Sequence, residues 1–429
     1  MHFKKTTFKN GLRLITAPMK DTNTVTVIVA VAAGSKYETK RINGLSHFLE
    51  HMFFKGTKKR SKTKDIAEAL DSVGGEYNAF TSQENTAYFA KVDKEHIDLA
   101  VDVISDIFLN SKLDAKEIEK ERGVILQEIN MYEDTPMFLV QEEFEHLLYG
   151  DQPAGWRVIG KKENVAWVGR KDFVDYIKNF YTAKNTVVCV AGNFGERGES
   201  GVIREIGRVF AKMRKGNENK MPKTIEKQTE PQLRIKHKKT DQAHLVLGFR
   251  EYNFFHPNRF AMALLANILG GTMSSRLFLS VREKSGLAYY VNASSEEYSD
   301  CGYFSVRAGV DTDRAKIEKT VKIILREIRG IRDRGVNGRE LQKAKDNLRG
   351  KMALSLESSD EVASYLAGQE IARREIKKPE EILAMIDKVK KNDILRVAKD
   401  IFVNGKLNLA LIGPIEDKRF LERILKIDN

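Results

Sequence analysis

The order of strand-like and helix-like segments occurs twice along the 429 residues, and this repeat constrains the fold more than any other feature. The first copy opens with two strand-like runs around Asn10-Gly11, a strong hairpin signal, and closes with an apolar strand that ends at Gly192. The second copy closes with a matching strand that ends at Gly413. We therefore predict an α+β protein with two homologous α/β-sandwich-like halves, each an antiparallel-rich sheet with helices packed on it, related by internal duplication.

A polar stretch near the midpoint of the chain separates the two copies. Residues 213–231 are poor in apolar side chains and have the composition of a linker. A chain of this length exceeds the usual size of one compact core, which favours two domains. We expect residues 1–215 to form the first domain and residues 228–429 to form the second.

Composition bounds the class of protein. The apolar and charged fractions, 41% and 31%, are typical of a soluble globular protein. No stretch approaches the roughly 20 apolar residues of a membrane span, and the first residues lack the apolar core of a secretory signal. Cys189 and Cys301 lie in separate apolar, strand-like contexts, which favours buried free thiols in a reducing compartment. We expect a cytoplasmic protein without membrane attachment.

The net charge of +13 raises the alternative of a nucleic-acid-binding protein. Most of the excess falls in the second half, in clusters such as residues 236–239 that have no interleaved aromatic side chains. Such clusters are typical of solvated faces, so we expect no nucleic-acid partner. Residues 101–150 are acidic instead, and a cleft lined by that segment would attract basic peptides.

The segment His47-Phe48-Leu49-Glu50-His51 brings together two imidazoles and a carboxylate. On an α-helix His47 and His51 lie one above the other on a single face, with Glu50 beside them. The apolar residues of the segment form the opposite stripe: Leu45, Phe48, Leu49, Met52 and Phe53. The alternative is a chance pair of histidines, but their position away from the packing face favours the His-x-x-Glu-His zinc motif.

A catalytic zinc site needs three protein ligands and one open position, so a third ligand must come from elsewhere. The predicted helix that begins near Asp114 carries Glu121 and Glu128, which are seven residues apart and share a face. A half-buried carboxylate needs a partner, and a metal ion is one. From spacing alone, an ordinary solvated helix edge is the better explanation of this pair.

With these motifs the chain resembles the pitrilysin-type zinc metallopeptidases, or inverzincins. That family includes insulin-degrading enzyme, the mitochondrial processing peptidase with its beta subunit, and short bacterial members of about this length. The resemblance covers essentially the whole chain. It runs through separated motifs in the family's order: residues 47–51, 74–82, 121–136, 273–278 and 282–289.

The resemblance implies a role for several residues of the first half. Glu128 corresponds to the third zinc ligand, after His47 and His51, and Glu121 to an outer-shell glutamate that supports the site. Residues 78–80, Asn78, Ala79 and Phe80, correspond to an edge strand that receives the substrate as an added strand. An extended peptide satisfies its backbone hydrogen bonds on such an edge, which agrees with this assignment.

In the second half, Arg282 and Tyr289 resemble the pair that contacts the substrate in this family. Their alternative explanation is an arginine on a helix surface and a tyrosine at the start of a strand. The helix of the second copy that corresponds to the His47 helix offers apolar residues such as Met262 and Leu265, so we expect no metal there.

The expected function is that of a zinc endopeptidase acting on unfolded peptides or flexible segments. Glu50 would serve as the general base for the water that Zn²⁺ activates, and Tyr289 with Arg282 would stabilise the oxyanion. Because the chain has two copies of the unit, we expect a homodimer that encloses a chamber. The alternatives are a non-catalytic scaffold subunit, which would typically have lost a motif residue, and a partner-dependent subunit of a heterodimer.

Overall fold

The computed structural model describes residues 1–427, which form two compact units. Each unit is built from three segments of the chain. The segments of unit 1 are Met1–Ile129, Arg157–Pro222 and Met352–Pro379. The segments of unit 2 are Asn130–Trp156, Lys223–Lys351 and the chain from Glu380 onward.

Unit 1 contains a six-stranded sheet in the order β1-β2-β6-β3-β5-β4. Its strands are β1 (Lys4–Thr7), β2 (Arg13–Pro18), β3 (Thr24–Val31), β4 (Glu76–Thr81), β5 (Thr86–Asp93) and β6 (Thr186–Gly192). β2 and β6 pair in parallel, and every other neighbouring pair is antiparallel. β4 is an edge strand, since it pairs with β5 alone.

Unit 2 contains a five-stranded sheet in the order β7-β11-β8-β10-β9. Its strands are β7 (Gln232–His237), β8 (Gln242–Arg250), β9 (Ala288–Glu297), β10 (Gly302–Asp311) and β11 (Leu407–Gly413). One pair, β7 with β11, is parallel, and the others are antiparallel. The order and directions repeat those of β2, β6, β3, β5 and β4, so the predicted α+β fold with two homologous halves is confirmed.

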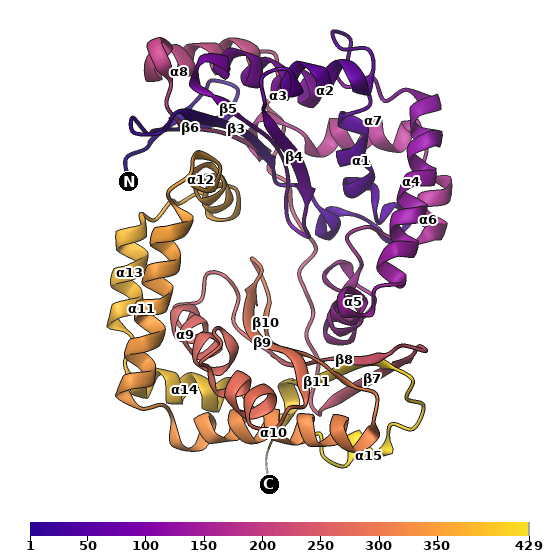
Figure 1. Cartoon of the computed structure of the whole chain (residues 1–429). Helices are drawn as coiled ribbons and strands as arrows, with labels where there is room; N and C mark the ends of the chain where they lie inside the picture. Colours follow the sequence, from indigo (N-terminus) through magenta and orange to yellow (C-terminus); the bar gives the residue numbers. More distant parts are fainter. Residues whose placement is uncertain (428–429) are drawn as a thin grey trace. The chain divides into compact units, whose positions relative to one another are not determined.

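The α-helices of unit 1 include ones that cover each face of its sheet. They are α1 (Leu45–Phe53), α2 (Thr63–Asp71), α3 (Ile97–Asn110), α4 (Ala115–Glu133), α6 (Lys162–Trp167), α7 (Arg170–Phe180), α8 (Gly198–Val209) and α12 (Ser359–Arg373). Figure 1 shows α3 and α8 on one face and α12 on the other. In unit 2, α5 covers one face of the sheet and α9 and α10 pack in the core of the other. The helices there are α5 (Pro136–Tyr149), α9 (Arg259–Gly270), α10 (Arg314–Arg334), α11 (Gly338–Ser355), α13 (Pro379–Lys388), α14 (Lys391–Ile401) and α15 (Arg419–Glu422).

Two helices pack with the sheet of the other sequence half, so the compact units differ from the expected domains 1–215 and 228–429. The helix α12 buries Val362 and Leu366 against the sheet of unit 1, and its fully buried Glu370 pairs with Arg13 at 3.1 Å. The helix α5 buries Phe144 against the sheet of unit 2, where Gly248 leaves room for the ring. The physical reason is that both faces of each sheet are apolar and both need a cover.

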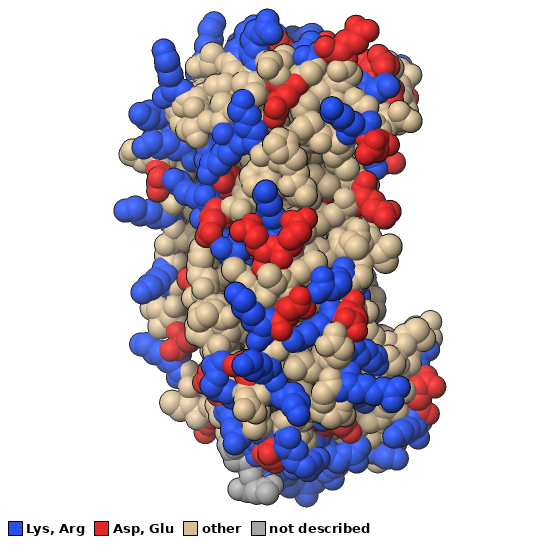
Figure 2. Space-filling model, turned by 90° about the vertical axis from the view of Figure 1, so that its left-hand side faces the viewer, with Lys and Arg blue, Asp and Glu red and all other residues tan. Residues whose placement is uncertain are grey.

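Other expectations concern the linker, the thiols and the charge. Residues 214–229 form neither helix nor strand, and Cys189 and Cys301 are both buried and not joined in a disulfide. Within the described part of the chain, none of the helices is long and apolar enough to cross a membrane. On the face that Figure 2 shows, Lys and Arg side chains are interspersed with Asp and Glu side chains, as on a solvated surface.

Glu251, the residue that follows β8, is a buried acid that makes the free energy of unfolding depend on pH. Its side chain accepts a hydrogen bond from Ser295, while its second oxygen has no hydrogen-bond partner. Burial, together with the charges of Glu297 and Glu296, raises the pKa of Glu251 well above its usual value. At a pH between the usual pKa of a glutamate in the unfolded chain and the raised pKa of folded Glu251, the folded protein holds a proton that the unfolded chain has lost. The free energy of unfolding therefore falls as pH rises through this range.

We predict that Glu251→Gln removes this dependence because the amide carries no ionisable proton. In thermal unfolding followed across pH, the variant should unfold at a higher temperature than wild type at neutral pH. The difference should shrink toward acid pH, below the usual pKa of a glutamate. A difference that stays constant with pH would contradict the assignment.

Candidate metal centre

The helix α1 begins at a turn that only glycine fits well, and a buried carboxylate caps it. Gly44 has a φ of 100°, and a Cβ there would lie 2.6 Å from the carbonyl oxygen of Ile159. The Glu38 carboxylate accepts the backbone N–H of Gly44 at 2.8 Å and of Ser46 at 2.6 Å. The side-chain amide of Asn43 also donates to Glu38, at 3.0 Å. A carboxylate at this end satisfies free N–H groups and complements the helix dipole.

The rotation of α1 about its axis is set by its apolar stripe. The five residues of the stripe are at most 1% exposed: Leu45, Phe48, Leu49, Met52 and Phe53. The side chains of His47, Glu50 and His51 are half-buried instead. The helix and the predicted division of its faces are therefore present in the structure.

Three side chains, two from α1 and one from α4, come close together. His47, His51 and Glu128, the last on α4, offer ligand atoms that all lie within 4.8 Å of one another. The Glu128 oxygens lie 3.6 Å from Nε2 of His47 and 3.6 Å from Nε2 of His51. Donor atoms of a tetrahedral zinc ion with bonds of about 2.1 Å are roughly 3.4 Å apart, so the arrangement fits this ion with small adjustments.

Glu121, two turns before Glu128 on α4, lies behind His51. Its Oε1 is 2.8 Å from Nδ1 of His51, and its Oε2 is 2.6 Å from Nζ of Lys55. When the Nδ1–H group donates to Glu121, the Nε2 lone pair of His51 is left for a metal ion. Glu121 is 5% exposed, so the two helical carboxylates differ in their surroundings as well as in their partners.

These contacts shift the pKa values of the histidine and of the two carboxylates. Burial lowers the pKa of His51, but the hydrogen bond to Glu121 and the charges of Glu128, Glu121 and Glu50 outweigh it and raise the pKa. Burial raises the pKa of Glu121, but its bonds to His51 and Lys55 bring it below the usual value. The pKa of Glu128 is likewise lowered, by His47 and His51, against the effect of burial. The two carboxylates thus favour the ionised form that a metal site requires.

Glu50 is held by a residue whose role the sequence did not reveal. Thr81, the last residue of β4, donates its hydroxyl to Oε2 of Glu50 at 2.6 Å. Thr81 belongs to the motif of residues 74–82, but nothing in its spacing indicated a contact with Glu50.

The edge strand β4 has the alternation of a half-exposed strand. Glu76, Asn78 and Phe80 are exposed, whereas Ala79 and Thr81 are half-buried. The backbone N–H of Ala79 donates to the side-chain oxygen of Asn78 at 2.8 Å. A peptide carbonyl that paired with this edge could replace that side-chain oxygen.

Arg282 and Tyr289 lie together in unit 2. A short π-helical segment, Phe278–Glu283, carries Arg282, whose guanidinium lies 4.9 Å from the ring centroid of Phe278 and 5.8 Å from that of Tyr289. The Tyr289 side chain, near the start of β9, is exposed at 76% of its surface. Cation–π contact of this kind keeps the two side chains beside each other.

Comparison with known proteins places the chain in a family. A model described as insulinase (peptidase family M16) matches residues 13–162, and one described as the peptidase M16 inactive domain matches residues 168–348. The uncharacterized zinc protease YmxG of Bacillus subtilis is 35% identical over 411 residues, covering 96% of this chain and 98% of the relative. An uncharacterized zinc protease of Streptomyces coelicolor is 34% identical over 422 residues, covering 97% and 90%.

Solved structures show the same fold. A protease from Helicobacter pylori has a TM-score of 0.88 at 24% identity and covers 96% of this chain and 99% of its own. A peptidase M16 inactive domain from Pseudomonas fluorescens has a TM-score of 0.87 at 17% identity and covers 97% and 99%. The chain belongs to peptidase family M16, so the resemblance seen in the sequence is confirmed, and relatives that share most of its length are named zinc proteases.

Proposed function

We propose that this protein is a zinc-dependent endopeptidase that hydrolyses unfolded peptides or flexible polypeptide segments. The observation that carries the proposal is the convergence of His47, His51 and Glu128, with Glu50 one residue from His51 on the same helix. Two imidazoles and one carboxylate are a ligand set typical of catalytic zinc, which keeps a fourth position open. The names of the full-length relatives support the same activity.

Zinc held by His47, His51 and Glu128 would supply Lewis-acid activation of a water molecule and of the scissile carbonyl. Glu50 would accept the proton of the attacking water and later give it to the leaving amine. Thr81 would hold one oxygen of Glu50, leaving the other for the proton. Glu121 would keep His51 in the tautomer that presents Nε2.

The substrate would add to the free edge of β4 as an extended strand. Asn78, Ala79 and Phe80 lie on this edge, and the backbone N–H of Ala79 is satisfied by a side chain that a peptide could displace. Strand addition requires free N–H and C=O groups on the peptide backbone. A folded protein whose backbone groups are already paired would therefore be a poor substrate. Arg282 and Tyr289, which lie beside each other, would contact the substrate and stabilise the oxyanion, because a guanidinium and a phenol hydroxyl donate hydrogen bonds to a negative oxygen.

We expect Glu50→Gln to retain zinc but to lose peptide hydrolysis, because glutamine cannot accept the proton. His51→Ala should lose zinc as well, since it removes a ligand. Zinc content by metal analysis and cleavage of a quenched fluorescent peptide measure the two properties. Normal hydrolysis by Glu50→Gln would show that the base assignment is wrong, and a metal-loaded but inactive wild-type protein would favour a non-catalytic scaffold.

Thr81→Val should lower kcat by about tenfold with zinc content unchanged, because the loss of one hydrogen bond to a charged group costs about 1.5 kcal/mol. Thr81→Ser, which keeps the hydroxyl, is the matched control and should retain most of the activity. Steady-state kinetics of the two variants with the same peptide decide the point. A wild-type kcat for Thr81→Val would exclude an orienting role for this hydroxyl.

We also propose that two chains form a homodimer that encloses a chamber. The chain contains two copies of the repeated unit, and the resemblance implies that short members of the family pair two chains. Arg282 and Tyr289 of one chain would then act with the metal half of its partner. Light scattering during an activity assay should find the activity in the dimer, and an active monomer at all concentrations would contradict the proposal.

A cytoplasmic location is part of the proposal. Cys189 and Cys301 are both buried and not joined in a disulfide, and burial raises the pKa of the Cys189 thiol well above its usual value. Free thiols without a disulfide partner are typical of proteins that work in a reducing compartment.

A further inference from the structure

The Glu121 carboxylate is almost completely buried, and each of its oxygens has one partner. Oε1 meets Nδ1 of His51 at 2.8 Å and Oε2 meets Nζ of Lys55 at 2.6 Å, with Glu121 itself 5% exposed. A neutral His51 that binds a metal through Nε2 gives Glu121 a hydrogen bond but no positive charge. Lys55 is therefore the cation in direct contact with this buried carboxylate, whereas an ion in the metal site would act on it only from beyond the His51 ring.

Lys55 comes from a turn whose backbone is fixed. The N–H of Lys55 donates to the carbonyl of Met52 at 3.1 Å, so the residue continues directly from the end of α1. Gly56, which follows, has a φ of 119°, and a Cβ there would lie 2.5 Å from the carbonyl oxygen of Ser61. The carbonyl of Gly56 accepts the N–H of Lys112 at 3.0 Å. The backbone that carries Lys55 is thus held on both sides.

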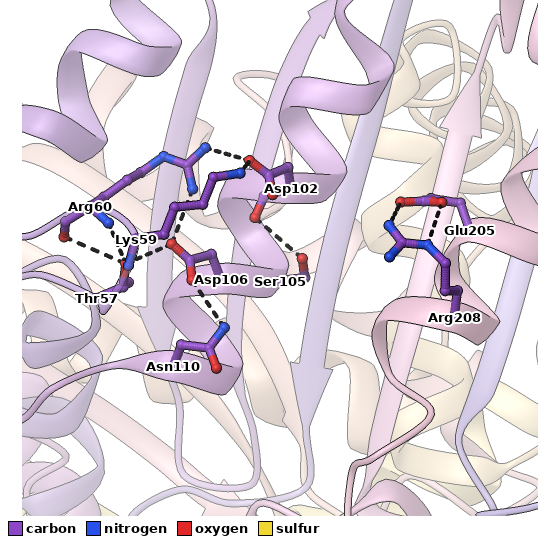
Figure 3. A network of polar contacts seen from close by, with 9 residues as sticks. All are labelled: Thr57, Lys59, Arg60, Asp102, Ser105, Asp106, Asn110, Glu205 and Arg208. Atoms are coloured by element: carbon purple, nitrogen blue, oxygen red, sulfur yellow. Dashed lines mark hydrogen bonds and ion pairs between the residues drawn. The ribbon is translucent and has the colours of Figure 1, made fainter.

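A buried polar network anchors the same turn to α3. The Thr57 hydroxyl donates to Oδ2 of Asp106 at 2.6 Å, and Arg60 pairs with Asp106 at 3.0 Å and with Asp102 at 2.5 Å (Figure 3). Thr57, Arg60 and Asp106 are at most 8% exposed. Because both partners of each buried pair are present, the network resists displacement of the turn. Glu205 and Arg208 on α8 form a separate pair in this view.

We propose that Lys55 is a positioning residue of the metal site, whose ammonium group holds the Glu121 carboxylate in the orientation that accepts Nδ1–H of His51. This inference rests on the proposed zinc site and adds to it a residue beyond the motif. Without the ammonium group, Glu121 would lose its direct cationic partner in a buried position and would rotate toward solvent. His51 would then lose the partner that sets its tautomer and ring orientation.

The neighbouring Lys59 offers a matched control. It lies four residues further along the same turn and also pairs with an acid, Asp102, at 2.5 Å. Its side chain is 60% exposed, against 23% for Lys55, and its ammonium group pairs with Asp102 rather than with Glu121. Removing Lys59 therefore changes the same segment and the same net charge but leaves the Glu121 carboxylate compensated.

The test is the zinc affinity of the purified full-length protein, measured by competition with a chromophoric chelator. Lys55→Met should weaken zinc binding about 10- to 100-fold, the range typical of losing an outer-shell partner. Lys59→Met should bind like wild type, and Lys55→Arg should recover most of the affinity because it restores the cation. Affinity of Lys55→Met within about twofold of wild type would overturn the proposal.

A double-mutant cycle separates positioning through Glu121 from a general effect on folding. In the Glu121→Gln background the charge is gone, so Lys55→Met should cost no further affinity. An equal loss in both backgrounds would show that Lys55 does not act through Glu121. This holds even if Lys55→Met lowers the thermal stability of the metal-free protein.

The outcomes also distinguish this inference from the proposed function. If wild type and His51→Ala bind zinc equally, the metal site itself is wrongly assigned. If His51→Ala loses zinc while Lys55→Met retains it, the zinc site stands and the role of Lys55 is refuted.

Discussion

The orientation of α1 is the constraint on which the rest of the site depends. Its apolar stripe fits the core of unit 1 in one rotation, and this rotation turns His47, Glu50 and His51 toward α4 and β4. Two buried carboxylates then fix the helix at its ends, Glu38 at the first turn and Glu121 beside the last. Burial makes each carboxylate costly unless it is fully paired, so each pairing is specific. The positions of these α1 side chains are therefore set by packing and by buried charge.

The need to cover both faces of each sheet explains which helices belong to each unit. Each sheet has two apolar faces, and each obtains one cover from a helix that belongs to the other half of the sequence, α12 in unit 1 and α5 in unit 2. Polar contacts define these positions, such as Arg13 with Glu370 in unit 1 and Lys236 with Glu143 in unit 2 at 2.8 Å. Each half of the sequence thus contributes one covering helix to the sheet formed by the other half. Among the residues described, the group of side chains that could hold a metal ion, His47, His51 and Glu128, lies in the first copy.

Much of the fold and of the central motif could be predicted without coordinates. The repeat of strand order, the helix around residues 45–53 and its division into apolar and polar faces all follow from local periodicity, and the structure contains each of them. The domain boundaries were harder because α5 and α12 look like ordinary amphipathic helices, and periodicity does not reveal which sheet a helix covers. For Glu121 and Glu128, helix spacing alone favoured a solvated edge, and the resemblance was needed to connect them with the histidines.

By itself the sequence determined the repeated fold, the helix that pairs two histidines with a glutamate, and membership in family M16, because these depend on patterns within continuous segments. Tertiary structure decided what surrounds that helix. The hydroxyl of Thr81 on Glu50, the ammonium of Lys55 on Glu121 and the cap by Glu38 involve side chains on strands, turns and helices that meet only after folding. Such contacts depend on rotamers and on distances of about 3 Å, and no spacing along the chain records them.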